Sequence, residues 1–238
     1  LAPIRSRPEE AVPSHRLCEL LRTLGTDAAN RVVICSGRDS GTLEKWFGGL
    51  PVSLAAEHGA FYKDRGAWRC NIRPASWDPK LSALLEHFAR KTPRSRIERK
   101  QTALAWHYRE ADSWLGQLRA QQLVNALMPL CARLNLHILQ GDKVVEIKSP
   151  RFTKGSETLR LLRQERYDFI LALGDDTTDD DMFAALPPRA LSIKIGNASE
   201  HARYNMPEQS EVVPLLELLA RDRGSFDPAG VKHAIRTT

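Results

Sequence analysis

Four short runs of mostly apolar residues constrain the fold of this chain more than any other feature. They lie at 31–35, 52–56, 169–173 and 191–195. Runs of this kind indicate strands that are buried on both faces, as in a parallel sheet covered by helices. Residues at helical spacing, such as Leu43 and Phe47, follow the first run, so the first two runs form a β-α-β unit. We therefore predict an α/β fold with a Rossmann-like parallel-sheet core.

Between the second and the third run, the pattern changes from strand–helix alternation to hairpins. Turn residues such as Gly141-Asp142 join neighbouring strands, and two longer helical stretches accompany them. Hairpins combined with helices indicate a small α+β module. We therefore predict an inserted cap module at 63–148, within a core that is formed by 1–62 and 149–238.

An acidic cluster, Gly174-Asp175-Asp176-Thr177-Thr178-Asp179, directly follows the third run. Open parallel sheets bind ligands at the carboxyl ends of their strands. Carboxylates this close repel one another unless a cation or solvent relieves them, and Mg²⁺ prefers one or two carboxylates with water and phosphate oxygens. Capping of the next helix explains part of the cluster. We expect Asp175 to bind the metal.

Two further segments are candidates for binding phosphate. Ser36-Gly37-Arg38 brings a hydroxyl and backbone N–H groups to a strand-to-helix turn, although Ser-Gly is also ordinary turn chemistry. Lys154 opens a helix, where the helix dipole disfavours a cation unless an anion is held nearby. The alternative for Lys154 is a solvent-facing lysine. With the acidic cluster, these segments favour phosphoryl transfer, which needs positioning and charge neutralisation more than covalent chemistry.

The three segments resemble the second, third and fourth motifs of haloacid-dehalogenase-type phosphatases. Longer strings are similar to trehalose-6-phosphate phosphatases within that superfamily. The strings are Ala56-Glu57-His58-Gly59-Ala60, Trp106-His107-Tyr108-Arg109, Lys143-Val144-Val145-Glu146 and the run from Gly174 to Phe183. The opening Leu1-Ala2-Pro3-Ile4 resembles the residues that follow the Asp-x-Asp-Gly-Thr motif of that family.

The resemblance implies hydrolysis of trehalose 6-phosphate with Mg²⁺ as cofactor. Ser36, Gly37 and Lys154 would bind the transferring phosphoryl group. Asp175 would be a metal ligand, and Asp179 would hold or orient the metal loop. The cap would recognise the disaccharide. The residues implied for substrate contact are Arg38, Glu57, His58, Gly59, Lys100, His107, Arg109, Lys143 and Glu146.

The same resemblance implies a catalytic nucleophile, and the 238-residue sequence lacks the motif that would supply it. In the family, an aspartate on the first strand forms an aspartyl-phosphate, and the aspartate two residues later is the general acid and base. Leu1 would follow that motif. We therefore expect a fragment that is inactive and poorly stable alone, with a further strand belonging between 31–35 and 168–173. An upstream or associated trehalose-phosphate synthase domain is a further expectation.

Charge and cysteine usage favour a cytoplasmic protein with a small-molecule substrate. The net charge is +6, but most of the basic residues are spread along the sequence. The exception is a basic cluster at Arg90–Arg96, which indicates a solvated loop. An anionic substrate also suits a basic protein. The four cysteines are scattered, as in a reducing compartment. No apolar run approaches the roughly 18 residues of a membrane span. We expect no nucleic acid and no membrane.

Three alternative interpretations stay open at this point. The same fold could act on another sugar phosphate, such as sucrose phosphate or mannosyl-glycerate phosphate. A non-catalytic regulatory domain of a trehalose-phosphate synthase could bind a sugar phosphate without turnover. A nucleic-acid-binding module would account for the charge, but it leaves the segment from Gly174 to Asp181 unexplained.

Overall fold

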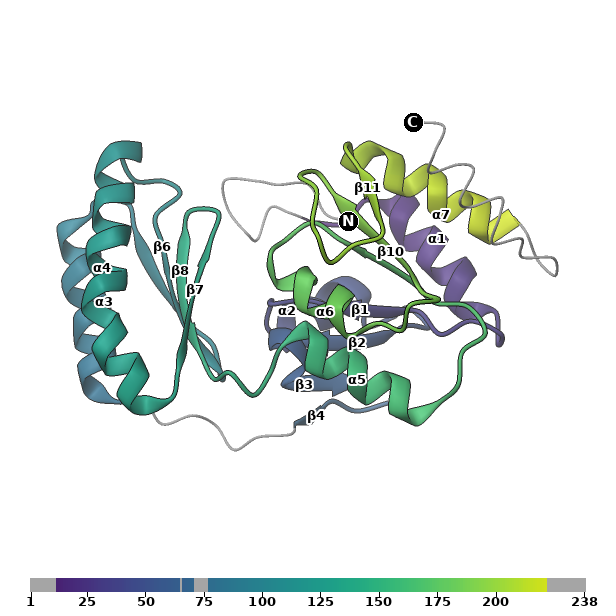
Figure 1. Cartoon of the computed structure of the whole chain (residues 1–238), viewed down its shortest axis with the longest axis horizontal. Coiled ribbons are helices and arrows are strands. Elements are labelled where there is room, and N and C mark those ends of the chain that lie inside the picture. The colour runs from purple at the N-terminus through teal and green to yellow at the C-terminus, as the bar shows by residue number, and fades with distance from the viewer. Residues whose placement is uncertain (1–11, 65, 71–76, 222–238) are drawn as a thin grey trace. The chain divides into compact units, whose positions relative to one another are not determined.

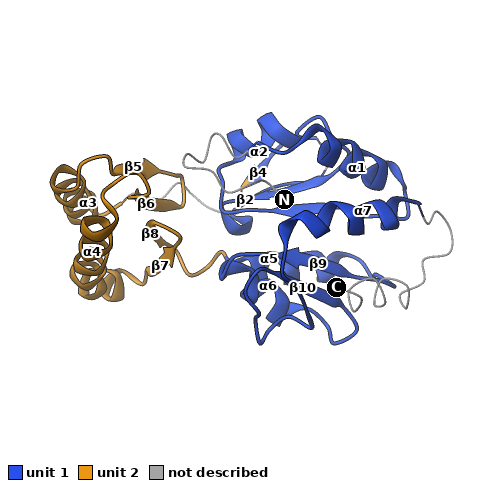
Figure 2. Cartoon of the chain, turned by 90° about the horizontal axis from the view of Figure 1, so that it is seen from above, with its two compact units in different colours: residues 1–69, 153–238 blue, residues 70–152 orange. Residues whose placement is uncertain are grey.

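The chain divides into two compact units in a computed structural model that describes residues 12–64, 66–70 and 77–221 (Figure 1). Unit 1 comprises Leu1–Arg69 and Thr153–Thr238, and unit 2 comprises Cys70–Phe152 (Figure 2). These boundaries lie a few residues from the predicted ones. The assignment of the units as phosphatase core and sugar-recognising cap stays a prediction. No helix in the described part of the chain is long and apolar enough to cross a membrane.

The first part of unit 1 that the structure describes contains two helices and a sheet of four strands. The helices are α1 (His15–Thr26) and α2 (Ser40–Phe47), and the strands are β1 (Val33–Cys35), β2 (Ser53–Ala56), β3 (Phe61–Lys63) and β4 (Arg69–Cys70). The strand order is β1-β2-β3-β4. β1 and β2 are parallel, with Ile34 opposite Leu54, and β3 returns antiparallel to β2. The predicted β-α-β unit is therefore confirmed.

The second sheet of unit 1 is entirely parallel. Its strands β9 (Leu171–Gly174), β10 (Leu191–Ile195) and β11 (Tyr204–Met206) are ordered β11-β10-β9. The helices described in this half are α5 (Lys154–Gln164), α6 (Thr178–Ala185) and α7 (Val212–Arg221). α7 packs beside α1, although the two are distant in sequence (Figure 1). Arg16 Nε donates to Glu217 Oε1 at 2.7 Å across this helix pair.

The parallel strands of unit 1 form two sheets in the described residues. β1 and β9 are each the edge strand of its own sheet. β2 and β10 are buried at every residue, whereas β9 is only half-buried throughout, although its sequence is apolar. Apolar edge strands with unpaired backbone are uncommon in stable sheets. The strand expected beside β1 and β9 stays a prediction.

Unit 2 is a four-stranded antiparallel sheet with two helices on one face. The strands are β5 (Arg96–Arg99), β6 (Ala103–His107), β7 (His137–Gly141) and β8 (Val144–Lys148), in the order β5-β6-β8-β7. The helices are α3 (Pro79–Lys91) and α4 (Ser113–Leu134). The α+β composition predicted for the inserted module is what the chain adopts here.

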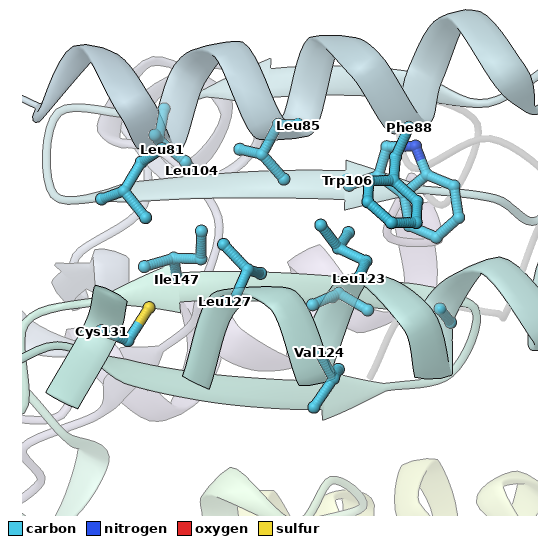
Figure 3. Close-up of a cluster of buried hydrophobic side chains, with 12 residues drawn as sticks. Leu81, Leu85, Phe88, Leu104, Trp106, Leu123, Val124, Leu127, Cys131 and Ile147 are labelled. Carbon is cyan, nitrogen blue, oxygen red and sulfur yellow. The ribbon is translucent and has the colours of Figure 1, made fainter. Parts of the chain in front are cut away.

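The core of unit 2 lies between these helices and the sheet. Leu85 of α3 and Leu127 of α4 are fully buried together with Trp106 and Ile147 of the sheet (Figure 3). Trp106 Nε1 donates to Ser95 Oγ at 3.1 Å, which satisfies the only polar atom of that side chain. Side chains alternate across a strand. The residues beside these core positions, including His107 and Glu146, therefore point to the opposite face of the sheet.

Candidate active site

The turn after β1 brings Ser36 to the carboxyl end of a parallel strand. Ser36 N–H donates to Ala55 O of β2 at 2.9 Å, and Arg38 N–H donates to Ser36 Oγ at 3.2 Å. Asp39 caps α2 by accepting from the N–H of Thr42 at 2.9 Å. A hydroxyl and a helix start at one strand end form a site suited to phosphate oxygens.

A buried segment with left-handed backbone conformation, residues 57–59, packs against this turn. Glu57, His58 and Gly59 have φ angles of 47°, 61° and 97°. Each non-glycine residue in this conformation costs on the order of 1–3 kcal/mol. The segment contacts the Ser36-Gly37-Arg38 turn, called the phosphate turn below after its predicted role, because His58 N–H donates to Ser36 O at 2.9 Å. The His58 ring also covers Gly37, where an added Cβ would lie 2.8 Å from His58 Nε2.

Gly59 connects the same segment to α5. A Cβ at Gly59 would lie 2.7 Å from the Cβ of Glu157, a buried residue on the first turns of that helix. Glycine is therefore required for both the positive φ and the close approach. The phosphate turn, the left-handed segment and α5 thus form one closely packed cluster.

Lys154 and Asp179 form a buried ion pair at the start of α5. Lys154 Nζ lies 2.6 Å from Asp179 Oδ1, and the two residues are 8% and 4% exposed. Burial alone would lower the pKa of Lys154, but the charge and hydrogen bond of Asp179, together with the charges of Cys35 and Asp176, outweigh burial and raise the pKa above the ordinary lysine value. The solvent-facing alternative for Lys154 is therefore excluded, and a permanent cation lies at this helix start.

The loop between β9 and α6 carries the acidic cluster. Asp179 Oδ2 accepts from the N–H of Asp176 at 2.9 Å, so both oxygens of Asp179 have partners. Asp175 is exposed directly after β9. Gly174 allows the loop to close, because a Cβ there would lie 2.3 Å from Asp179 Cγ. Asp179 therefore orients the loop in this structure, while its direct binding of metal stays a prediction.

The residues of the acidic loop could supply some of the ligands of a divalent cation, but not a complete ligand set. Within the described ranges, no group of three or more His, Cys, Asp and Glu side chains is arranged to hold a metal ion. Asp175 supplies an exposed carboxylate, which is the hard oxygen donor that Mg²⁺ prefers. Such an ion takes its remaining ligands from water and phosphate oxygens.

Lys194 also contacts the acidic loop, and it was not among the predicted site residues. It lies in the buried strand β10, and its Nζ donates to Asp176 O at 2.6 Å. The signal that could have identified it is a lysine in the middle of an otherwise apolar run, since buried lysines are rare unless they are paired.

Unit 2 gathers several of the predicted substrate residues on the face of the sheet that the helices leave open. Lys100 Nζ donates to Glu146 Oε2 at 2.8 Å. His107 Nε2 lies 2.7 Å from Glu98 Oε2, and Glu98 was not predicted. This hydrogen bond is the main reason that the pKa of Glu98 is lowered. The period-2 alternation that placed His107 on one strand face could also have singled out Glu98 on β5.

The remaining predicted substrate residues have defined partners. Arg109 Nη2 donates to Asp142 Oδ2 at 2.7 Å. Lys143 Nζ lies 5.9 Å from the centre of the Tyr108 ring, and Tyr108 N–H donates to Lys143 O at 3.0 Å. In unit 1, the Arg38 guanidinium covers the Trp46 ring at 4.6 Å.

The structure therefore connects the predicted residues in two groups. Within unit 1, Ser36 contacts His58, and Lys154 pairs with Asp179. Gly59, next to His58, adjoins Glu157 of the helix that Lys154 begins. Lys100 and Glu146 are paired within unit 2, as are His107 and Glu98. The first group can bind an anion beside a carboxylate-bound cation, and the second offers paired donors and acceptors for hydroxyl groups. Their individual roles stay predictions.

Comparison with known proteins identifies the family. The family model for trehalose-phosphatase matches residues 1–211. A trehalose-phosphatase of Zygosaccharomyces rouxii is 36% identical over 97% of this chain and 31% of its own length. A bifunctional trehalose-6-phosphate synthase/phosphatase of Thermoproteus tenax is 37% identical over 92% of this chain and 30% of its own length. The chain thus spans about three tenths of these curated relatives.

The fold agrees with a solved structure of the same family. The C-terminal domain of trehalose-6-phosphate phosphatase from C. albicans is 34% identical, with a TM-score of 0.84, over 92% of this chain and 88% of that domain. The family model covers the phosphate turn, the acidic loop and the whole of unit 2. The chain belongs to the trehalose-phosphatase family, which has the haloacid-dehalogenase-like fold.

Proposed function

We propose that this protein hydrolyses trehalose 6-phosphate to trehalose and inorganic phosphate in trehalose biosynthesis, with Mg²⁺ as cofactor. The observation that carries the proposal is the buried Lys154–Asp179 pair beside the exposed Asp175. It places a permanent cation, at the start of α5, against the acidic loop that follows β9, where Asp175 offers an exposed carboxylate to a metal. Family membership supports the chemistry, and the names of the relatives support the substrate.

Different residues of unit 1 bind the phosphoryl group, neutralise its charge and hold the metal. The Ser36 hydroxyl and the Gly37 N–H donate to phosphoryl oxygens, and the Lys154 ammonium neutralises part of their charge. Asp175 holds the metal, and Asp179 keeps both Lys154 and the acidic loop in place. Mg²⁺, when bound, neutralises further negative charge on the phosphoryl group. The attacking aspartate of the family's route is not assigned to any residue of this sequence.

The residues of unit 2 recognise the sugar. Lys100, Glu146 and His107 offer charged groups that strengthen hydrogen bonds to hydroxyls. Arg109 and Lys143 add donors next to the adjoining ends of β6 and β8. In unit 1, Arg38, Glu57, His58 and Gly59 adjoin the phosphate turn, which suits contacts near the phosphorylated end of the substrate. A cytoplasmic location and a fused or associated trehalose-phosphate synthase domain belong to the same proposal, the latter suggested by the bifunctional relative.

The test is phosphate release from a panel of sugar phosphates. The panel contains trehalose 6-phosphate, sucrose phosphate, mannosyl-glycerate phosphate and glucose 6-phosphate, each with Mg²⁺ and with EDTA. Two preparations are compared, the 238-residue chain and the protein as its gene encodes it, including any residues before Leu1. In the protein as its gene encodes it, we expect Mg²⁺-dependent release from trehalose 6-phosphate at least tenfold faster than from the other sugar phosphates.

Two results would contradict the proposal. Faster release of phosphate from another sugar phosphate would mean that this fold acts on that compound and not on trehalose 6-phosphate. Tight binding of trehalose 6-phosphate without any release of phosphate, in the protein as its gene encodes it, would favour the regulatory alternative. Asp175→Asn and Lys154→Met serve as variants in which both binding of phosphate and its release are expected to fall.

A further inference from the structure

The acidic loop is held from its inner side by a lysine that the proposed reaction does not use. Lys194 is only 5% exposed, and it lies in β10, which is buried at all five positions. Its Nζ donates to Asp176 O at 2.6 Å and lies 3.2 Å from Asp180 Oδ1. A buried ammonium is stable only with such acceptors. Both acceptors belong to the segment that follows the predicted metal ligand Asp175.

The backbone of Asp176 is therefore fixed at both of its polar groups. Its N–H donates to the buried carboxylate of Asp179, and its C=O accepts from Lys194. Asp175 lies between β9 and this doubly held residue. Two fixed neighbours leave little freedom for the backbone of Asp175, so the direction of its carboxylate depends on these contacts.

Asp180 completes the arrangement. Ser199 Oγ donates to Asp180 Oδ1 at 2.7 Å, the same oxygen that Lys194 contacts. The charge of Lys194 is thus balanced locally by Asp180. Lys194 can hold the loop without cancelling the negative potential that attracts a cation to Asp175.

We propose that Lys194, balanced by Asp180 and Ser199, is a positioning residue that orients Asp175 for the divalent cation. The proposal rests on the metal site of the proposed function, and it adds residues to that function that act without touching substrate or metal. Loss of Lys194 frees the carbonyl of Asp176, and the preorganisation of Asp175 is lost with it. The affinity for the cation then falls, while contacts with the sugar are unchanged.

The experiment compares Lys194→Met and Lys194→Arg with the wild-type protein as its gene encodes it, including any residues before Leu1. One readout is the Mg²⁺ concentration for half-maximal phosphate release. The other is the rise in melting temperature on adding Mg²⁺ without substrate, which needs no activity. We expect Lys194→Met to need about tenfold more Mg²⁺, with a smaller rise in melting temperature and a KM for trehalose 6-phosphate within twofold at saturating Mg²⁺. Lys194→Arg should lie between Lys194→Met and wild type in both the Mg²⁺ requirement and the rise in melting temperature.

Ser192→Ala is the matched control. Ser192 is equally buried on the same strand, and its Oγ accepts from the N–H of Arg203 at 3.0 Å, away from the acidic loop. We expect this variant to lose stability without a change in Mg²⁺ requirement. If Lys194→Met fails to fold, Ser199→Ala replaces it, with an expected two- to threefold increase in the Mg²⁺ requirement.

The possible results separate this proposal from the proposed function. A wild-type protein without phosphatase activity but with a Mg²⁺-induced rise in melting temperature, reduced by Lys194→Met, would support the positioning role and contradict the function. An active wild-type protein whose Lys194→Met variant keeps the wild-type Mg²⁺ requirement would contradict the positioning role alone. Equal effects of Lys194→Met and Ser192→Ala, or no response to Mg²⁺ in the wild type, would also overturn it.

Discussion

Lys154 Nζ lies 2.6 Å from Asp179 Oδ1, and both side chains are almost completely buried. Lys154 begins α5, and Asp179 lies in the first turn of α6. The residue proposed to bind phosphate and the residue that orients the acidic loop are thus electrostatic partners. Because each neutralises the charge of the other, we expect a change at either position to affect both the proposed phosphate site and the acidic loop.

Replacement of Lys154 by methionine should therefore reduce both stability and activity. The carboxylate of Asp179 would stay buried without its cation, and breaking a buried pair in this way costs about 3–5 kcal/mol. Loss of the charge near the phosphoryl group should lower kcat by about 10²–10³-fold. Urea unfolding and phosphate release measure the two effects. Lys63→Met is the control, since Lys63 pairs with the more exposed Glu44 and its loss should cost less than about 1 kcal/mol. Equal losses in the two variants would contradict the special role of the buried pair.

Substitution of Gly59 by alanine should destabilise unit 1 more than the same change at Gly66. Both glycines have positive φ angles, 97° and 84°, so both substitutions introduce backbone strain of about 1 kcal/mol. Only Gly59 also has a close neighbour, because its added Cβ would lie 2.7 Å from Glu157, whereas Gly66 has nothing within 4 Å. We expect Gly59→Ala to cost at least about 2 kcal/mol in urea unfolding. A difference below about 0.5 kcal/mol between the two variants would show that the left-handed segment can move away from α5.

The stability of unit 2 should depend on pH through Glu98. The pKa of Glu98 is lowered from 4.5 first by the hydrogen bond from His107, with Lys100 lowering it and Glu146 raising it. A lowered pKa in the folded state contributes stability that is present above about pH 4.5 and is lost as the pH falls through the folded value. Glu98→Gln should therefore be less stable than wild type at pH 6, by up to about 1 kcal/mol because the pair is partly exposed.

Urea unfolding at pH 6, 5, 4 and 3.5, followed by tryptophan fluorescence, measures this dependence. The difference between wild type and Glu98→Gln should shrink toward pH 3.5. Glu86→Gln is the control, since Glu86 forms an exposed pair with Arg99. A Glu98→Gln difference that stays constant across this range would mean that Glu98 stabilises unit 2 without any contribution from its charge.

The layers of the fold and the strand ends could be predicted because they depend on local patterns. Apolar runs predict buried strands, and the acidic cluster after 169–173 marks a carboxyl end. The left-handed conformation of Glu57 and His58 could not be predicted, because non-glycine residues adopt it only when surrounding contacts impose it. The partners of buried charges, such as Lys194 with the acidic loop, depend on tertiary packing between segments separated in sequence. A lysine in an apolar run indicates that a partner exists, but not which residue it is.

The pair formed by Lys100 and Glu146 should decide how tightly trehalose 6-phosphate binds, without affecting the chemical step. Their side chains are only 9% and 12% exposed, and Lys100 Nζ lies 2.8 Å from Glu146 Oε2. Each side chain therefore fixes the orientation of the other, in which both can form hydrogen bonds to a sugar. We expect Lys100→Met and Glu146→Gln each to raise the KM for trehalose 6-phosphate about tenfold, which corresponds to about 1.4 kcal/mol.

The control for this prediction is a substrate without a disaccharide. Hydrolysis of p-nitrophenyl phosphate uses only the phosphoryl site of unit 1, so its kcat/KM should stay within twofold of wild type in both variants. The double variant should lose less than the sum of the single losses, because the two residues act as one pair. Parallel losses on both substrates would mean that the pair supports the structure of unit 2 and takes no direct part in sugar recognition, since only a residue that contacts the disaccharide can separate the two substrates.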